Sequence, residues 1–442
     1  MSNDLRDEQG GALIVALLMM SIMMLLGVAM MASAQDSVVR TVWDRSSSQS
    51  FHAAEAGFDQ VMFMARSSNL AAGSTINGKT RDAEYKVTVS GMTTGGAGEF
   101  LFDIKATGAA PSFANPKAKR AIRSRIAALS PYSMFLASVS AGDTIQGNAT
   151  INGAFYTRDL FSLTGTGASA GKFTGGPLFV KDLAGTVSPT GDLNLQGNAQ
   201  VGTAADPIYL FLDGQITGNA ANAFSKGTYS DVPDLNFPMI TISDIVNKYR
   251  PTATEVIDSD LTKVGTTNLS LNRTTVPAGG YTSPGGHLSF TWLNGARTQA
   301  LLTVNGTVYV DGDVQIGQTT GVAVTTYFQG KGTIVAYGNV KIESSFLPKT
   351  SFPNPDVIGF ITADSAEVEG KPGDIVYAVM YSSSELEFEG KVEYHGAALT
   401  QKMEFDNNPS LILDPSVATN LPPGMPSPEA QVSVSGWKEV KP

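Results

Sequence analysis

The chain of 442 residues contains no cysteine and only three histidines. Without cysteine no disulfide can hold the fold, so a large apolar core or stacked repeats must do so. His52, His287 and His395 lie far apart, and no metalloprotease, serine-hydrolase or nucleotide-binding motif accompanies them. We therefore expect a protein that is not an enzyme. Polysaccharide cleavage needs only two carboxylates, so a polysaccharide-degrading enzyme stays the alternative.

Charge is also scarce, because only 16% of the residues are charged. Thirty basic against forty acidic residues give a net charge of −10. That balance excludes a general nucleic-acid binder. Glycine (46) and proline (22) are frequent, which favours turn-rich β structure over a helix bundle. The length suits two or three structural units.

Residues 12–68 contain no proline, and residues 12–34 contain no charge either. Such a run of 23 residues can cross the ~30 Å hydrocarbon core of a bilayer as a helix. Helical signals continue beyond it, since Asp36 and Arg40 can pair at i,i+4 and apolar residues recur at helical spacing. The sequence predicts one helix, with a transmembrane part at 12–34 and a periplasmic part at 35–68.

The next two regions predict strands. Residues 69–135 contain three segments of alternating polarity, around 85–89, 100–104 and 121–126, and predict a small antiparallel sheet against the helix, an α+β roll. From residue 136 to 442 the phrase GDTIQGNA (142–149) returns as GDLNLQGNA (191–199), with looser copies at 312–317 and 338–342. Imperfect repeats of this type predict a parallel β-helix-like solenoid. Residues 218–290 are less regular and are interpreted as an insertion.

The C-terminal third gives a register. Apolar pairs two residues apart recur at intervals near one coil, at Val340/Ile342, Ala366/Val368, Leu386/Phe388 and Met403/Phe405. Alternation points these residues inward and their neighbours outward, namely Lys341, Glu343, Glu367, Glu369, Glu387, Glu389, Glu404 and Asp406.

Stacked strands lie ~4.8 Å apart, so these outward carboxylates would repel one another. Ca²⁺ or a basic partner would relieve the repulsion, with Glu367, Glu369, Glu387 and Glu389 as the candidate site. The alternative is a solvated face that keeps the region soluble. We expect no other cofactor.

A second charged feature is basic. Lys117, Lys119, Arg120, Arg123 and Arg125 follow one another within nine residues. Such a run can face lipid headgroups or an acidic neighbour. Its alternation with alanine and isoleucine also fits the solvent face of an ordinary strand.

The N-terminal pattern identifies a family likeness. Residues 9–18 (QGGALIVALL), then LLG at 25–27 and AAEAG at 53–57, resemble the PilX-like minor pilins of Gram-negative type IV pilus systems over roughly the first 60 residues. The remainder resembles the large C-terminal region of long pilus-assembly proteins, in its Gly-Asn repeats and in the phrases DPSV (414–417), LPPG (421–424) and SGWKE (435–439).

The resemblance implies that residues 1–11 are a prepilin leader, cleaved after Gly11, with N-methylation of Ala12. It implies a structural role in pilus assembly or priming, or at the pilus tip, and a contribution to adhesion. The implied partners are other minor and major pilins, a tip adhesin, prepilin peptidase and the inner membrane, and no nucleic acid. The implied location is the bacterial inner membrane, with a periplasmic C-terminal domain that is extracellular after assembly.

Ala16 occupies the fifth position after the implied cleavage, where most pilins carry glutamate. A lone carboxylate in lipid is costly unless an upstream subunit pairs with it, so a subunit with Ala16 can sit first in a filament. The alternative is that Ala16 is a lipid-facing residue of an ordinary anchor. K-type pseudopilins of type II secretion also lack this acid, and a membrane-anchored glycan-binding module is the remaining alternative.

Overall fold

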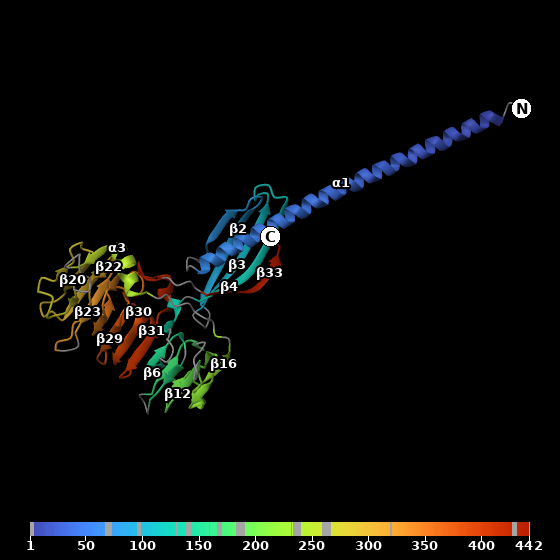
Figure 1. The fold of residues 1–442 in the computed structure, drawn as a ribbon. Helices are drawn as coiled ribbons and strands as arrows, with labels where there is room; N and C mark the ends of the chain where they lie inside the picture. Colours follow the sequence, from blue (N-terminus) through green and yellow to red (C-terminus); the bar gives the residue numbers. More distant parts are fainter. Residues whose placement is uncertain are drawn as a thin grey trace.

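A computed structural model of the chain shows one long helix and two β-rich parts (Figure 1). It describes residues 4–66, 73–94, 99–129, 131–137, 144–158, 160–165, 170–182, 191–230, 232, 240–258, 267–318, 321–426 and 431–441. Residues 1–3 of the predicted leader, 67–68 of the predicted helix, and Gly142 and Asp143 of the first repeat lie outside these ranges.

Helix α1 (Asp4–Arg66) is unbroken over 63 residues, so the predicted single helix is observed. Its N-terminal part extends away from the rest of the chain (Figure 1), and the side chains of residues 13–45 are exposed. From Ser46 onward one face becomes buried, with Ala53, Ala54 and Val61 fully so. The helix therefore has an apolar part without protein contacts and a part that packs on a sheet.

The sheet against α1 is antiparallel, with the order β1-β2-β3-β4-β33. Its strands are β1 (Thr75–Lys79), β2 (Glu84–Thr94), β3 (Glu99–Ala110), β4 (Ala118–Leu129) and β33 (Gln431–Val440). Alternation turns one set of apolar side chains towards the helix, namely Val87, Val89, Phe102, Ile104, Ala106, Ile122 and Ile126. The predicted antiparallel sheet is thus present.

Strand β33 was not expected in this sheet, because the predicted boundaries assign residues 136–442 to the large region. It pairs with β4 in the register Val434↔Ile126. Strand pairing between residues some 300 positions apart leaves no local pattern in the sequence, which explains the difference. The large region is therefore inserted between two neighbouring strands of the small sheet.

We call this inserted region, residues 131–426, the head. Its first half holds β5 (Phe135–Ala137), β6 (Thr144–Gly147), β7 (Thr150–Asn152), β8 (Phe155–Arg158), β9 (Leu160–Leu163), β10 (Lys172–Thr174), β11 (Leu178–Lys181), β12 (Asp192–Leu195), β13 (Gln200–Val201), β14 (Ile208–Leu212), β15 (Ile216–Gly218) and β16 (Ser225–Tyr229).

Its second half holds β17 (Glu255–Ile257), β18 (Leu269–Leu271), β19 (Tyr281–Thr282), β20 (Leu288–Trp292), β21 (Gln299–Val304), β22 (Gly306–Val310), β23 (Val314–Gly317), β24 (Thr325–Gln329), β25 (Lys331–Ala336), β26 (Val340–Glu343), β27 (Phe346–Pro348), β28 (Val357–Thr362), β29 (Ala366–Gly370), β30 (Ile375–Gly390), β31 (Glu393–Asp406) and β32 (Ser410–Leu413).

Most head strands pair in parallel with the third strand that follows them, as β5 does with β8 and β22 with β25. Three parallel ladders result, and one strand from each makes a coil. Only β19, β20 and β21 pair antiparallel among the described head strands. The apolar side chains that point into the coils form one continuous core.

The two halves meet in the middle of the stack. The last coil, in β31 and β32, pairs with the first coil, as in Leu399↔Leu136 and Leu411↔Ile151. The chain therefore enters centrally, winds out to β16, crosses to the opposite end at β17 and winds back. Residues 218–290, predicted to be an irregular insertion, include β16, β17 and β18, which join the ladders.

The crossing segment contains α2 (Ile242–Asp244), η4 (Ile245–Tyr249) and α3 (Arg250–Thr252). Thr241 begins it with a capping box, in which its side chain accepts from the Asp244 N–H and its own N–H donates to the Asp244 carboxylate. The Ile240 N–H donates to the Tyr381 hydroxyl at 2.9 Å. Ile245 and Tyr249 are buried against the outer side of the ladders. Shorter turns are η1 (Pro131–Ser133), η3 (Ala220–Asn222) and η5 (Pro415–Thr419).

The close approach of α1 to the sheet depends on Gly108. A Cβ atom there would lie 1.9 Å from the Ser50 carbonyl oxygen. We expect Gly108→Ala to lower the free energy of unfolding by about 1–3 kcal/mol, because backbone atoms must shift. Gly279→Ala is the matched control, since a Cβ atom there meets nothing within 4 Å. Urea denaturation checks this, and equal stabilities of the two variants would contradict it.

Candidate functional site

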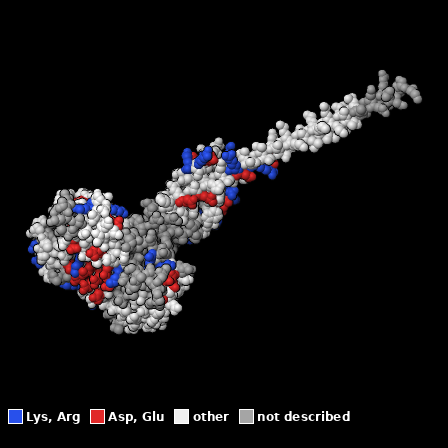
Figure 2. Space-filling view, in the orientation of Figure 1, with Lys and Arg blue, Asp and Glu red and all other residues white. Residues whose placement is uncertain are grey.

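The outward residues of β26, β29, β30 and β31 form two columns. One runs Lys341↔Glu367↔Glu387↔Glu404, and the other runs Glu343↔Glu369↔Glu389↔Asp406. The predicted inward pairs of the same strands are all at most 6% exposed. This register is the predicted one. We call the two columns the acidic ladder, and Figure 2 shows acidic side chains gathered on this part of the head.

Lys341 is the cation at one end of the ladder. Its Nζ lies 2.9 Å from a carboxylate oxygen of Glu367, 2.9 Å from one of Glu369 and 3.2 Å from one of Glu343. Burial lowers the pKa of Lys341, but hydrogen bonds to Glu367 and Glu369 outweigh it and raise the pKa overall. One ammonium thus neutralises part of the charge of three carboxylates.

Further along the ladder the charge is less compensated. Burial, followed by the carboxylates of Glu367 and Glu389, raises the pKa of Glu387. Burial and the carboxylate of Glu369 raise the pKa of Glu389. Lys402 pairs with Glu385 at 2.8 Å and also with Glu404. The middle of the ladder therefore keeps the repulsion expected of stacked carboxylates.

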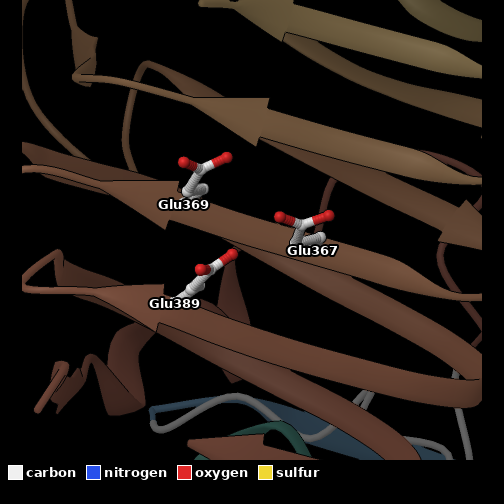
Figure 3. A group of neighbouring side chains, drawn as sticks. All are labelled: Glu367, Glu369 and Glu389. Atoms are coloured by element: carbon white, nitrogen blue, oxygen red, sulfur yellow. The ribbon is translucent and has the colours of Figure 1, made fainter. Parts of the chain in front are cut away.

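Three of the four candidate cation ligands come together. Single oxygens of Glu367, Glu369 and Glu389 lie within 4.8 Å of one another (Figure 3), and Glu387 lies beside Glu367 in its column. Ca²⁺ prefers six to eight oxygen ligands, whereas Lys341 already binds two of these carboxylates. Calcium binding stays a prediction, and it requires displacement of the Lys341 ammonium.

The ladder borders an open depression of about 450 Å³. Gln315 extends the first column by one coil, and its Nε2 donates to Glu343 at 2.5 Å. The other polar residues of the lining that sequence reasoning missed are Asp313, Asn339, Ser365 and Glu385. The looser repeats at 312–317 and 338–342 contain Asp313, Gln315 and Asn339 and could have indicated them. Asp313 and Asn339 occupy equivalent coil positions, and Gln315 is equivalent to Lys341.

The other predicted site residues lie elsewhere. Gly11 and Ala12 lie within α1, and Ala16 is exposed on it. In the basic run, Arg120 pairs with Glu439 and donates to Ser47, and Arg125 pairs with Asp103. These two arginines bind within the small sheet and against α1, while Lys117, Lys119 and Arg123 are exposed.

Comparisons with known proteins include a structural similarity to a pilin. No protein-family model matches the chain, and no curated protein sequence matches it. The crystal structure of the competence-associated pilin ComZ from Thermus thermophilus is similar at 15% identity and a TM-score of 0.46, covering 89% of this chain and 97% of that one. Similarity at this level assigns no function to the chain.

The repulsion in the ladder predicts a stabilising substitution. Glu387→Gln removes one of the negative charges that repel one another, and it should raise the free energy of unfolding at pH 7 by about 0.2–1 kcal/mol. The folded chain binds the Glu387 proton more tightly than the unfolded chain does, so the contribution of Glu387 to stability falls as pH rises above 4.5. The gain should therefore vanish below pH 4.5, as denaturation at both pH values can show.

Glu385→Gln is the matched control. It removes the same charge but breaks the pair with Lys402, so no gain is expected at pH 7. A gain of equal size in both variants would mean that net charge, not the Glu387 column, sets the effect.

Lys341 should matter in the opposite direction. Lys341→Met keeps the apolar stem and leaves three carboxylates without their cation, so stability should fall by about 1–2 kcal/mol. Added salt should shrink the loss. Lys391→Met is the control, because Lys391 is exposed and forms no ion pair with the described residues. Equal losses would contradict the role of Lys341.

Melting temperatures with and without Ca²⁺ test the cation prediction, which an unchanged melting temperature would reject.

Proposed function

We propose that the chain is a membrane-anchored pilin-type subunit of a type IV pilus, with a structural role in assembly or priming or at the tip. One observation carries the proposal. A single helix, α1, joins a charge-free segment long enough to cross a bilayer to the core of a small antiparallel sheet. The order of parts at the N-terminus, with Gly10-Gly11 ahead of the apolar segment, supports the same class.

The exposed apolar surface of α1 needs partners. The side chains of residues 13–31 are exposed and nearly all apolar, which suits lipid or the helices of neighbouring subunits. Val38, Val39, Val42 and Trp43 continue this exposed apolar surface beyond the charge-free segment. Lipid does not reach all of them, so contact with other pilin helices accounts for them best.

Cleavage after Gly11 would leave a mature chain that begins at Ala12, directly at the apolar segment. Ala16 brings no carboxylate into that segment, so the subunit needs no upstream amine as a partner. This property supports a first, tip-proximal place among the pilins.

We interpret the three parallel ladders of the head as a β-helix-like solenoid. Both of its connections to the small sheet leave from the middle of the stack, after β4 and after β32. Figure 1 places the head at the opposite end of the small sheet from the projecting part of α1. Such a head is suited to present a surface, and we assign it contact with a tip partner or with the surroundings rather than catalysis.

Processing tests the proposal directly. We expect protein recovered from cell envelopes to begin at methylated Ala12, and only when prepilin peptidase is present. Gly11→Leu should keep the leader and fail to reach pili, because the peptidase reads the residue before the cut. Intact mass and N-terminal sequencing provide the measurement.

Gly10→Ala is the control and should be processed normally. A wild-type chain that begins at Met1, or one cleaved after Ala34, would refute the pilin assignment. The chain would then be an anchored or secreted head, and glycan binding would become the leading alternative.

A further inference from the structure

Basic side chains gather where α1 leaves the small sheet, on the side of its apolar part (Figure 2). Residues of α1, of the β1–β2 turn and of the β3–β4 turn line a depression of about 500 Å³ there. Its charged residues are Arg45, Lys79, Arg81, Asp82, Glu84 and Lys117. The chain as a whole has ten more acidic than basic residues, so an excess of cations at one end is a local arrangement.

The two acids of this depression already have partners. Glu84 pairs with Lys79 at 3.0 Å and accepts the Phe113 N–H at 3.0 Å, and these bonds lower its pKa, the Phe113 N–H most. The Asp82 carboxylate accepts from the Gln49 side chain at 3.3 Å. Neither acid forms an ion pair with the remaining cations of the depression.

Those remaining cations are Arg45, Arg81 and Lys117, and Lys119 lies next to them on β4. We call these four residues the basic collar. All four are exposed, and none forms an ion pair with the residues that the structure describes. Lys119 lies over the Phe113 ring, with its Nζ 5.9 Å from the ring centre. Four cations therefore face solvent at the place where the helix leaves the small sheet.

The collar lies close to the expected bilayer surface. Arg45 follows Ala34, the end of the charge-free segment, by eleven residues, or about 16 Å of helix. A headgroup layer takes up about 5–8 Å of that distance, and the long arginine and lysine side chains shorten the rest. Electrostatic attraction acts over about 8 Å at physiological ionic strength, so the collar is within its range.

Two neighbouring residues agree with this placement. Trp43 is 59% exposed and Val42 is 46% exposed, and both lie on α1 between the charge-free segment and Arg45. Trp43 follows Ala34 by nine residues, or about 14 Å of helix, which places it between the headgroup layer and Arg45. The same stretch of helix thus combines an exposed aromatic side chain with the cations of the collar.

We propose that the basic collar binds the anionic phospholipid headgroups of the membrane in which α1 is anchored. This rests on the anchoring proposed above but does not require assembly into a pilus. The collar then holds the small sheet near the membrane before assembly, and extraction of the subunit must break these contacts.

The absence of cysteine allows a clean test on the full chain. Ala114 is exposed on the β3–β4 turn, and Ala114→Cys accepts one donor dye there. The labelled protein is inserted into nanodiscs of phosphatidylcholine, with or without phosphatidylglycerol, that carry an acceptor dye on their headgroups. Energy transfer then reports the distance from the collar to the lipid surface.

We expect higher energy transfer in the discs that contain phosphatidylglycerol, and a loss of this difference at ~1 M salt. The triple variant Arg81→Gln, Lys117→Gln, Lys119→Gln should lose the difference as well. The ratio of molecules whose collar lies at the lipid surface to molecules whose collar lies away from it should fall up to about fivefold for each charge removed. The matched control is Lys172→Gln, Lys331→Gln, Lys391→Gln, which removes three exposed head charges and should behave as wild type.

Equal energy transfer in both kinds of disc would overturn the proposal, and would leave an acidic protein neighbour as the partner of the collar. Equal losses in the collar variant and the control would overturn it too, since net charge alone would then explain them. Failure of the wild-type chain to insert into either disc would instead refute the membrane anchoring, which co-purification with the discs shows separately.

Discussion

The head depends on one constraint, the in-register hydrogen bonding of parallel strands. This pairing places residues of successive coils above one another, about 4.8 Å apart. On the inside it stacks apolar side chains, such as the Phe388 and Phe405 rings with centres 6.1 Å apart. On the outside the same pairing stacks carboxylates. A shift by one residue would turn the acids into the core, so the register that buries the apolar residues also fixes the charged columns.

The insertion of the head into the small sheet follows from where the chain enters the stack. Entry and exit lie on adjacent coils, so β4 and β33 can remain paired across an excursion of some 300 residues. The cost is a crossing segment that must pass along the outside of the ladders. Tyr309 and Tyr381 make that outer side apolar, and Tyr249 of the crossing segment covers it. The crossing segment therefore forms part of a second apolar cluster, on the outer side of the ladders.

The sequence allowed prediction where the relevant pattern is local. The unbroken α1 followed from an absence of proline, and pairs such as Val340/Ile342 gave both the buried face and the register, because alternation and coil length are short-range properties. The partner of β33 and the order of the coils could not be predicted. Pairing between strands that are far apart in the sequence depends on how their edges meet in space, and this leaves no local pattern. The acidic ladder was predicted as a row of carboxylates, but the three bonds of Lys341 depend on rotamers and burial that alternation does not specify.

The uneven distribution of charge connects the two parts of the molecule. The basic collar lies at the base of α1, and the acidic ladder lies on the head beyond the small sheet (Figure 2). A negatively charged membrane surface attracts the first and repels the second. Both forces decay within about 8 Å, so the ladder experiences the surface only when the head tilts towards it. The collar then sets the resting position of the small sheet, while the partly uncompensated charge around Glu387 opposes collapse of the head onto the membrane. If lysines neutralised the ladder fully, the core of the head would be the same, but the ladder would no longer repel the membrane surface. This repulsion is a physical reason for the head to retain stacked carboxylates.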